Sequence, residues 1–461
     1  MIAWLARFDT RAQIALLALL AAYFMVWPIW RAGFPIEIAQ NEGWNAYHAD
    51  AAMRAAGAAP LYPPTDTLIV NNYPPLSFYV VGALGEIFGD ALYVGRIMSL
   101  LAVLGLGALI GVMIVELGGG AAGAAVGGLW FIAVMSRSFT RFVGMNDPQL
   151  VAHVLMMGAF VWLIRREARG QSAVPPILAM AVAGFYKHNI VAVPVTSLLW
   201  LIGRDWRRAM LPLAVGAGAA ALGLLICILV YGDAFLANLM TPRTYHLERA
   251  LKGLGRLQWI LPALALWAIW AVAERKRDAA RFTARFIAVA FVAYVVQWSG
   301  DAILDNAQFD LVIATAVGLG MAFDRAGATP FGRSHGATAA RAVVVLVVAA
   351  RLLATLRIEP ALVLFDPAYR AQYYENAEAV RAEAVRLAQI PGPVACDYKV
   401  VCRLAGKPFV YDDFRAEMLV ATGAARGLDV EGLMRAHGLT YVHNDPRGGI
   451  DALFRAIVGK P

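Results

Sequence analysis

Long apolar runs separated by short polar segments fill most of the first 357 residues. Several of these runs approach the ~20 residues that a helix needs to cross the hydrocarbon core of a membrane. We therefore expect an α-helical polytopic membrane protein with about eleven transmembrane helices. The spans are predicted at roughly 13–31, 91–116, 121–136, 149–164, 173–187, 189–203, 209–231, 258–273, 284–299, 308–323 and 339–356.

The basic residues predict how these spans are oriented. Arg7 and Arg11 precede the first span, and four later segments rich in Lys and Arg fall on the same side, at 165–169, 204–208, 275–285 and 325–341. Loops on the cytoplasmic side carry an excess of these residues, so we assign this side to the cytoplasm. Eleven spans then place the N-terminus in the cytoplasm and the chain from about 358 outside.

One apolar segment, 74–89, does not fit this pattern, because its apolar part is only about 14 residues long. Counting it as a span would invert every later basic loop. We interpret it as an interfacial or re-entrant helix on the outer side. The first outer loop then covers 32–74, and its many aromatic residues favour short helices on the membrane surface over a solvated connector.

Composition supports the membrane assignment. The chain is 60% hydrophobic and 16% charged, whereas soluble domains carry about 25% charged residues. The net charge of +8 does not indicate a nucleic-acid partner, because the basic residues cluster between apolar runs. No phosphate-binding P-loop, Gly-x-Ser-x-Gly, dinucleotide fingerprint or His/Cys spacing typical of metal sites occurs in a suitable context.

The first outer loop contains the first candidate site. Glu42 and Asp50 would share one face of a helix predicted over 42–57, beside Trp44. A poorly solvated carboxylate beside a tryptophan is a plausible general base. The alternative is that Glu42 is a surface acid at a helix start. Asp50 and Trp44 are candidates for an acceptor or secondary site.

A second candidate site precedes the span at 149. Asp147 stands before Pro148, so it is either a functional acid or only a helix cap. Arg137 and Arg141 fall on the outer side, where the topology rule disfavours them. Each therefore needs a partner, and an anionic phosphate is suitable.

A third candidate site lies between two short spans, at Lys187 and His188. Lys187 could supply a point charge to a phosphate and His188 a hydrogen bond, or the pair could form only a hairpin tip. Further along, Arg243 lies in a long outer loop that could form a lid. Asn306 belongs to a polar cluster at the outer end of two spans, and both residues are further candidates for an acceptor or secondary site.

The tail, 358–461, is far more polar than the rest of the chain. Short strands are predicted at 394–396, 409–411 and 440–443, with helices around 371–388, 413–425 and 430–437. We expect a small α/β domain in the periplasm. Cys396 and Cys402 could form a disulfide in that oxidising compartment, or remain two thiols.

The order of several short motifs resembles a known family. A single span leads to an acidic outer loop, followed by Tyr73-Pro-Pro-Leu76, Gly95-Arg96-Ile-Met-Ser99, Arg141-x-x-x-x-Asn146-Asp147 and Gly184-x-x-Lys187. Over about 10–325 this order resembles the GT-C glycosyltransferases that use polyprenyl-phosphate sugars. The similarity is greatest to the protein O-mannosyltransferase, aminoarabinose transferase and lipopolysaccharide galacturonosyltransferase branch.

The resemblance implies a reaction and roles for individual residues. Members move a sugar from an undecaprenyl-type phosphate to an acceptor hydroxyl on the outer face, with inversion. Their first outer loop often holds an Asp-Glu pair, which here is Asn41-Glu42. The role of the missing acid falls on Glu42, with Asp50 or Glu37 as substitutes. The second family acid matches Asp147, and the phosphate-binding cations match Lys187 and Arg141.

The remaining expectations concern partners and alternatives. Some family members hold a divalent cation, so Glu42 and Asp147 could share Mg²⁺ or Mn²⁺, although nothing in the sequence demands a cofactor. The expected partners are the lipid-linked donor, a glycan, lipid or protein acceptor, and the bilayer of a bacterial inner membrane. One alternative is a transporter or flippase, but the sequence lacks paired half-chain repeats. Another is a lipid- or glycan-binding protein that has lost activity.

Overall fold

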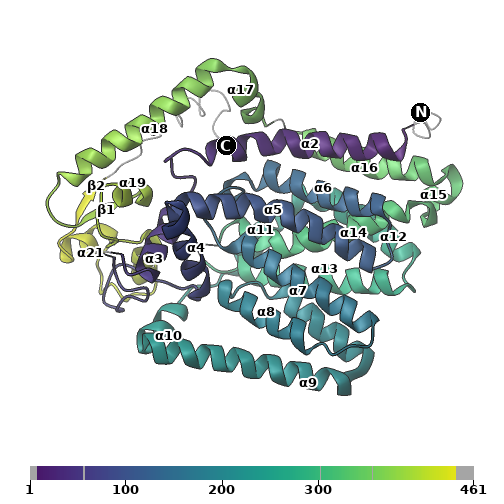
Figure 1. The fold of residues 1–461 in the computed structure, drawn as a ribbon, viewed down its shortest axis with the longest axis horizontal. Helices are drawn as coiled ribbons and strands as arrows, with labels where there is room; N and C mark the ends of the chain where they lie inside the picture. Colours follow the sequence, from purple (N-terminus) through teal and green to yellow (C-terminus); the bar gives the residue numbers. More distant parts are fainter. Residues whose placement is uncertain (1–7, 56–57, 302, 356, 443–461) are drawn as a thin grey trace.

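The computed structural model describes residues 8–442, apart from 56–57, 302 and 356. A bundle of long helices forms its main body, and shorter elements gather at one end (Figure 1). Arg7 and His443, which we assigned to the cytoplasmic side and to a strand, lie outside the described residues. The bundle helices are α2 (Thr10–Arg31), α5 (Ala91–Glu116), α6 (Ala121–Ser138), α7 (Gln149–Ala168), α8 (Val174–Tyr186), α9 (Ala192–Tyr231), α12 (Leu261–Ala273), α13 (Asp278–Trp298), α14 (Phe309–Asp324) and α16 (Ala337–Leu353).

Every predicted span coincides with a helix. Within the described ranges, seven helices are long and apolar enough to cross a membrane, or eight if the bent pair 247–259 and 261–273 is counted as one span. The 40-residue α9 covers two predicted spans and contains a non-helical residue at Asp205, between them. The chain is thus a multi-pass membrane protein, and the number of eleven crossings stays a prediction.

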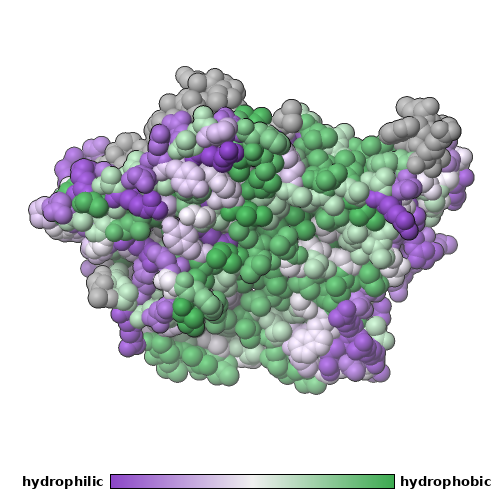
Figure 2. Space-filling view, turned by 45° about the horizontal axis from the view of Figure 1, so that its top comes forward, coloured by the Kyte–Doolittle hydropathy of each residue, from purple (hydrophilic) through white to green (hydrophobic). Residues whose placement is uncertain are grey.

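The surface agrees with this description. A hydrophobic band crosses the middle of the molecule, and hydrophilic residues gather at both ends (Figure 2). Large apolar side chains such as Leu101, Leu229 and Val272 are exposed. Exposed apolar surface of this extent marks contact with lipid rather than with water.

The basic segments meet at one end of the bundle. Arg165 pairs with Glu116 at 2.7 Å, and Arg204 lies 3.8 Å from Asp278. Both pairs join segments at the end where α2 begins, which also carries α15 (Pro330–His335) (Figure 1). Clustering at a single end is what the charge pattern requires. Which compartment this end faces stays a prediction.

The shorter elements occupy the opposite end. They are α3 (Gln40–Ala52), α4 (Leu76–Phe88), α10 (Asp233–Leu239), α11 (Leu247–Leu254), α17 (Glu359–Phe365), α18 (Pro367–Ala388), β1 (Val394–Cys396), α19 (Lys399–Leu404), α20 (Asp413–Ala421), α21 (Val430–Ala436) and β2 (Thr440–Val442), with short 3₁₀ turns η1 (Thr140–Phe142), η2 (Gly255–Trp259) and η3 (Asp305–Gln308). A further 3₁₀ turn, η4 (Ala326–Ala328), lies beside α15 at the basic end. β1 and β2 pair in parallel, with Val394 opposite Thr440.

Two local expectations at this end were wrong. The helix predicted over 42–57 ends at Ala52, and residues 56–57 lie outside the described chain. The predicted strand at 409–411 is not a strand. Instead, Phe409 stacks on Tyr47 of α3, with ring centroids 5.0 Å apart. The segment is apolar because it packs on the first outer loop, not because it joins the sheet.

The segment 74–89 forms α4, which lies at the same end as α3 (Figure 1). Thirteen residues make a helix of about 20 Å, which is shorter than the ~30 Å hydrocarbon core. Its last residues, Ile87 and Phe88, are 71% and 74% exposed. An interfacial helix would present such residues to lipid, so the geometry agrees with our interpretation.

The tail packs closely on the first outer loop. Gly43 of α3 lies so near α19 that an added Cβ would be 2.6 Å from the Cβ of Lys399 and from the backbone nitrogen of Val400. The side-chain carboxyl group of Glu37 accepts hydrogen bonds from the backbone N–H groups of Gly43 and Val400, at 3.1 and 2.9 Å. The two regions therefore share one buried core.

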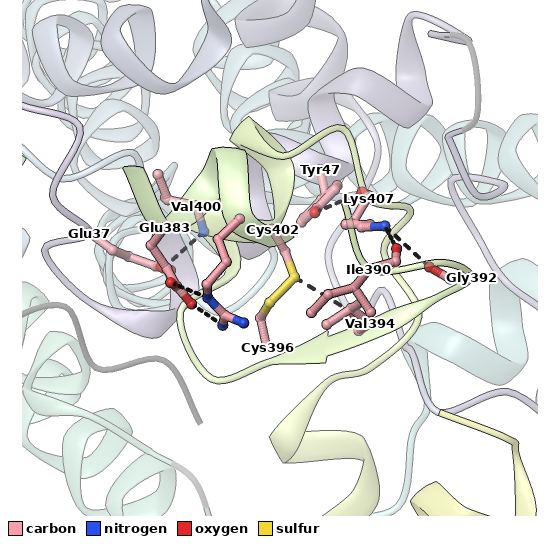
Figure 3. Close-up of a disulfide and its surroundings, with 11 residues drawn as sticks. Glu37, Tyr47, Glu383, Ile390, Gly392, Val394, Cys396, Val400, Cys402 and Lys407 are labelled. Atoms are coloured by element: carbon pink, nitrogen blue, oxygen red, sulfur yellow. Dashed lines mark hydrogen bonds and ion pairs between the residues drawn. A yellow bond between two sulfur atoms is a disulfide. The ribbon is translucent and has the colours of Figure 1, made fainter. Parts of the chain in front are cut away.

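Figure 3 shows this junction around a disulfide between Cys396 and Cys402, which joins β1 to α19. The Tyr47 hydroxyl donates to the carbonyl of Lys407 at 3.0 Å. Arg403 of α19 adds an ion pair with Asp50 at 2.7 Å. Asp50, which we expected near an acceptor, thus holds the tail in place.

Candidate active site

A cavity of about 470 Å³, called the Lys187 cavity below, opens at the end that carries α3. Four sequence-predicted residues line it together: Lys187 and His188 after α8, Arg243 after α10, and Asn306 in η3. Tyr73 of the first outer loop completes the polar wall. These segments are far apart in the chain, and the fold brings them to one place.

Local structure explains how two of these residues are held. α8 ends at Tyr186, and Lys187 then takes an extended conformation that turns the chain toward α9. The segment after Arg243 is fixed by a backbone bridge between Tyr245 and Gly300. The N–H of His246 also donates to the carbonyl of Ser299 at 2.8 Å. The predicted lid segment is therefore fastened to the end of α13.

Lys187 is the most unusual residue of this cavity. Its side chain is 2% exposed, and its Nζ has no hydrogen-bond partner among the described residues. The Nζ lies 3.2 Å from the centroid of the Tyr73 ring, in a cation–π contact. A buried ammonium without hydrogen bonds is costly, so the cavity favours an anion.

Asp147 lies next to this cavity, in a small hollow that it lines with Ser77 and Tyr186. Its Oδ1 accepts from the N–H of Gln149 at 2.8 Å, as expected of a residue at a helix start. Its Oδ2 is buried without a hydrogen-bond partner among the described groups. Asp147 therefore starts α7 and also keeps one oxygen free near Lys187.

Glu42 has a different environment from the one we expected. Its side chain is wholly buried, and each carboxylate oxygen accepts two hydrogen bonds. Arg96 donates through Nε at 2.7 Å and Nη2 at 2.6 Å. The N–H groups of Ile38 and Asn146 donate at 2.9 and 3.0 Å. This geometry does not fit a general base, because no free face of the carboxylate reaches a cavity.

The Glu42–Arg96 pair instead fastens three segments together. Arg96 of α5 also donates to backbone carbonyls of the first outer loop, including that of Ile36 at 2.8 Å. Its neighbour Gly95 makes room for the loop before α7, because an added Cβ would overlap the side-chain oxygen of Asn146. Sequence reasoning missed this role, although a lone arginine inside an apolar run was a signal of it.

Asn41 occupies the position where the family acid was expected, and it lines the Lys187 cavity. Its side chain is an amide, which cannot accept a proton at neutral pH. No Asp or Glu belongs to the described lining of that cavity. The cavity thus holds cations for a phosphate but no carboxylate for an acceptor.

Solved structures share this architecture. ArnT from Cupriavidus metallidurans aligns in the apo state with a TM-score of 0.55 and 15% identity, over 90% of this chain and 89% of that one. ArnT bound to undecaprenyl phosphate aligns with 0.56 and 17%, over 92% and 90%. The Archaeoglobus fulgidus oligosaccharyltransferase, in its apo form, aligns with 0.51 and 11%, over 87% and 65%. The chain has the GT-C fold. No protein-family model matches the sequence, and no curated protein does.

Within this GT-C fold, two predicted phosphate ligands lie elsewhere. Arg137 is buried and donates to the carbonyls of Leu352 and Thr355 at 2.7 and 2.6 Å, so it ties α6 to the end of α16. Arg141 is exposed and lines a separate cavity with Arg256. Neither residue lines the Lys187 cavity, because Arg137 contacts the end of α16 and the cavity of Arg141 is lined by residues of α2 and α17.

Trp44 is buried between the first outer loop and the tail. Its indole N–H donates to the carbonyl of Val70 at 3.2 Å and to Asp412 at 3.1 Å. It does not contribute to the Lys187 cavity but lines an adjoining one. Sequence reasoning named Trp44 and missed Asp412, because nothing in the tail sequence indicates which loop it contacts.

The expected metal pair is not supported by its geometry. Both oxygens of Glu42 are engaged by Arg96 and backbone N–H groups. Among residues 8–442, with the stated gaps, no group of three or more His, Cys, Asp or Glu side chains is placed to hold a metal ion. Glu42 and Asp147 therefore do not fit as shared ligands.

Proposed function

We propose that this chain is an inverting glycosyltransferase that takes a sugar from a polyprenyl-phosphate carrier and transfers it to an acceptor hydroxyl. The buried Lys187, which faces a 470 Å³ cavity without a hydrogen-bond partner, carries this proposal. The fold supports it, because one structure with the same fold is ArnT bound to undecaprenyl phosphate. The acceptor belongs to the cell envelope, as a glycan, a lipid or a protein.

The cations of the cavity suit the leaving group. When the bond between the sugar C1 and the phosphate oxygen breaks, negative charge accumulates on the phosphate. Lys187 and Arg243 would stabilise that charge in a site where little water competes. His188 and Asn306 add hydrogen-bond donors on the same wall. Glu42 and Arg96 hold the first outer loop in the position that this arrangement needs.

The other wall suits the carrier lipid. Leu239, Met240, Val296 and Ile303 line the same cavity, between α10 and α13. Met240 is strongly exposed, so this side opens at the surface of the bundle. A prenyl chain could leave the cavity there and enter the bilayer. The site lies at the end opposite the basic loops, which supports a periplasmic active site in a bacterial inner membrane.

Binding of undecaprenyl phosphate to the full-length protein, measured by native mass spectrometry, tests the donor site. Lys187→Met should weaken binding about 10- to 100-fold, as expected for the loss of a charge-assisted hydrogen bond. The matched control is Lys252→Met, because Lys252 is exposed on α11, pairs with Glu248 and does not line the cavity. Equal binding by the Lys187 variant and the wild type would refute the proposed site.

Turnover tests the reaction itself. The sugar-linked lipid that co-purifies with the protein is identified by mass, and an envelope extract is then added as acceptor. We expect the lipid to lose the mass of its sugar and to become the free phosphate. A transporter would leave the sugar-linked lipid intact and move it across a vesicle membrane, and that outcome would overturn the proposal.

A further inference from the structure

Sugar transfer to a hydroxyl needs a group that removes the acceptor proton. The Lys187 cavity lacks a carboxylate in its described lining, and Asn41 stands where one was expected. Glu42 is fully engaged by Arg96. If the chain is the transferase proposed above, its base must reach the reacting centre from outside this cavity.

A second cavity of about 470 Å³ adjoins the first one and lies between the first outer loop and the tail. The two cavities share five lining residues, among them Asn41, Tyr73 and Arg243. Arg243 also reaches the tail, where its guanidinium lies 5.0 Å from the centre of the Phe414 ring. A molecule in one cavity is therefore a direct neighbour of a molecule in the other.

The tail supplies the far wall of the second cavity, and Asp412 is its best-fixed acid. The Asp412 side chain is 5% exposed. The indole N–H of Trp44 donates to Oδ2 at 3.1 Å, and the N–H of Phe414 donates to Oδ1 at 3.1 Å. Each oxygen keeps a further lone pair for a substrate.

The other acids of this wall are less suitable. Asp413 is paired with Lys399 at 3.0 Å, Glu417 is exposed on α20, and Asp397 is only half-buried. Asp412 differs from these three because it is buried and accepts a hydrogen bond from the indole N–H of Trp44. We propose that the acceptor enters through the second cavity and that Asp412, contributed by the tail, is its general base.

The step balances in atoms and charge. The acceptor oxygen forms a bond to C1 of the sugar while its proton passes to the Asp412 carboxylate. The bond between C1 and the phosphate oxygen breaks, and its electron pair leaves with the carrier phosphate. Lys187, which lines the first cavity and not the second, holds that phosphate on the side of the sugar away from Asp412, so the configuration at C1 inverts. Asp412 then releases the proton to water as the product departs.

The surroundings of Asp412 set the pH at which it can act. Burial raises the pKa of Asp412 to about 6, Asp413 adds to the rise, and Lys399 of α19 opposes it. Arg415 of α20 and Tyr73 of the first outer loop also interact with its charge, and Arg243 faces the same cavity. A base with this pKa is ionised in most molecules at neutral pH.

The test is single-turnover transfer from the co-purified sugar lipid by the full-length protein in lipid nanodiscs. Asp412→Asn should lower the rate at least 100-fold and leave binding of undecaprenyl phosphate unchanged. Asparagine is also a good helix cap, so α20 should persist. The control is Asp366→Asn, because Asp366 caps α18 and lines neither cavity.

The outcomes separate the two proposals. If the wild type transfers sugar and Asp412→Asn keeps more than a tenth of its rate, Asp412 is not the general base. The proposed function would remain intact in that case. A wild type without transfer would exclude the function itself. If Asp412→Asn fails to fold, Trp44→Phe decides. In the wild type the transfer rate should rise with pH, with a midpoint near 6. Trp44→Phe removes the hydrogen bond from the indole to Asp412, which lowers the pKa of Asp412, so the midpoint should move to higher pH. An unchanged midpoint would overturn the assignment.

Discussion

The Glu42–Arg96 pair makes a prediction that separates a structural role from a catalytic one. In Glu42→Gln, an NH₂ group replaces one of two oxygens, and each oxygen accepts from one Arg96 N–H and one backbone N–H. In either orientation of the amide, two hydrogen bonds are lost, because its NH₂ group then faces one N–H of Arg96 and one backbone N–H. The Arg96 charge also stays buried without its counter-ion.

Breaking a buried pair in this way costs about 3–5 kcal/mol. Two lost hydrogen bonds to a charged group, at about 1.5–3 kcal/mol each, give a similar figure. We expect Glu42→Gln to lower the free energy of unfolding by that amount, measured by SDS-induced unfolding in mixed micelles. Undecaprenyl phosphate binding should weaken together with stability, because the first outer loop loosens.

A double-mutant cycle provides the control. Glu42→Gln combined with Arg96→Met removes both charges, so the double variant should be more stable than the sum of the single effects predicts. A catalytic Glu42 would behave differently. If Glu42→Gln unfolds like the wild type while turnover disappears, our structural assignment of this residue is refuted.

Three further predictions concern the junction of the tail and the orientation of the chain. Gly43→Ala should detach the tail, because the new Cβ would collide with Lys399; limited proteolysis should then cleave the tail faster, and unchanged cleavage would contradict the packing. Burial raises the pKa of Glu37 to about 8, so the native state keeps a proton that the unfolded chain has lost. The free energy of unfolding should therefore fall as pH rises from about 4.5 to 8, and this slope should diminish in Glu37→Gln. A cysteine replacing the exposed Tyr245 should react with an impermeant reagent in intact cells, and one replacing Arg208 only after permeabilisation; the reverse pattern would invert the topology.

The membrane part of the fold could be predicted from sequence because the bilayer fixes the length of an apolar run. The span predicted at 91–116 coincides with α5. The charge pattern also grouped the basic loops correctly at one end. In contrast, 409–411 failed as a strand because its apolar residues serve a contact with Tyr47, more than 350 positions earlier. A short apolar pattern in the sequence cannot distinguish a residue of a β-strand from a residue that packs on a distant helix.

The candidate site was predictable in part for a related reason. Lys187, His188, Arg243 and Asn306 are polar residues at the ends of apolar runs, where polarity needs an explanation, and the structure gathers them. Glu42 satisfied the same criterion, but its partner Arg96 was hidden inside a span. Asp412 had no such signal, because acidic residues are ordinary in a polar tail. Only the fold shows that it meets Trp44.

The packing of α19 against α3 also means that the two sides of the candidate site are completed at different times during synthesis of the chain. Lys187 and Arg243 are in the chain long before the segment that carries Asp412 is synthesised, and on the predicted topology that segment crosses the membrane before it packs on α3. A chain caught at this stage could hold a loaded carrier, but the far wall of the proposed acceptor cavity would be absent. The donor sugar would then stay on its carrier until synthesis and export were complete.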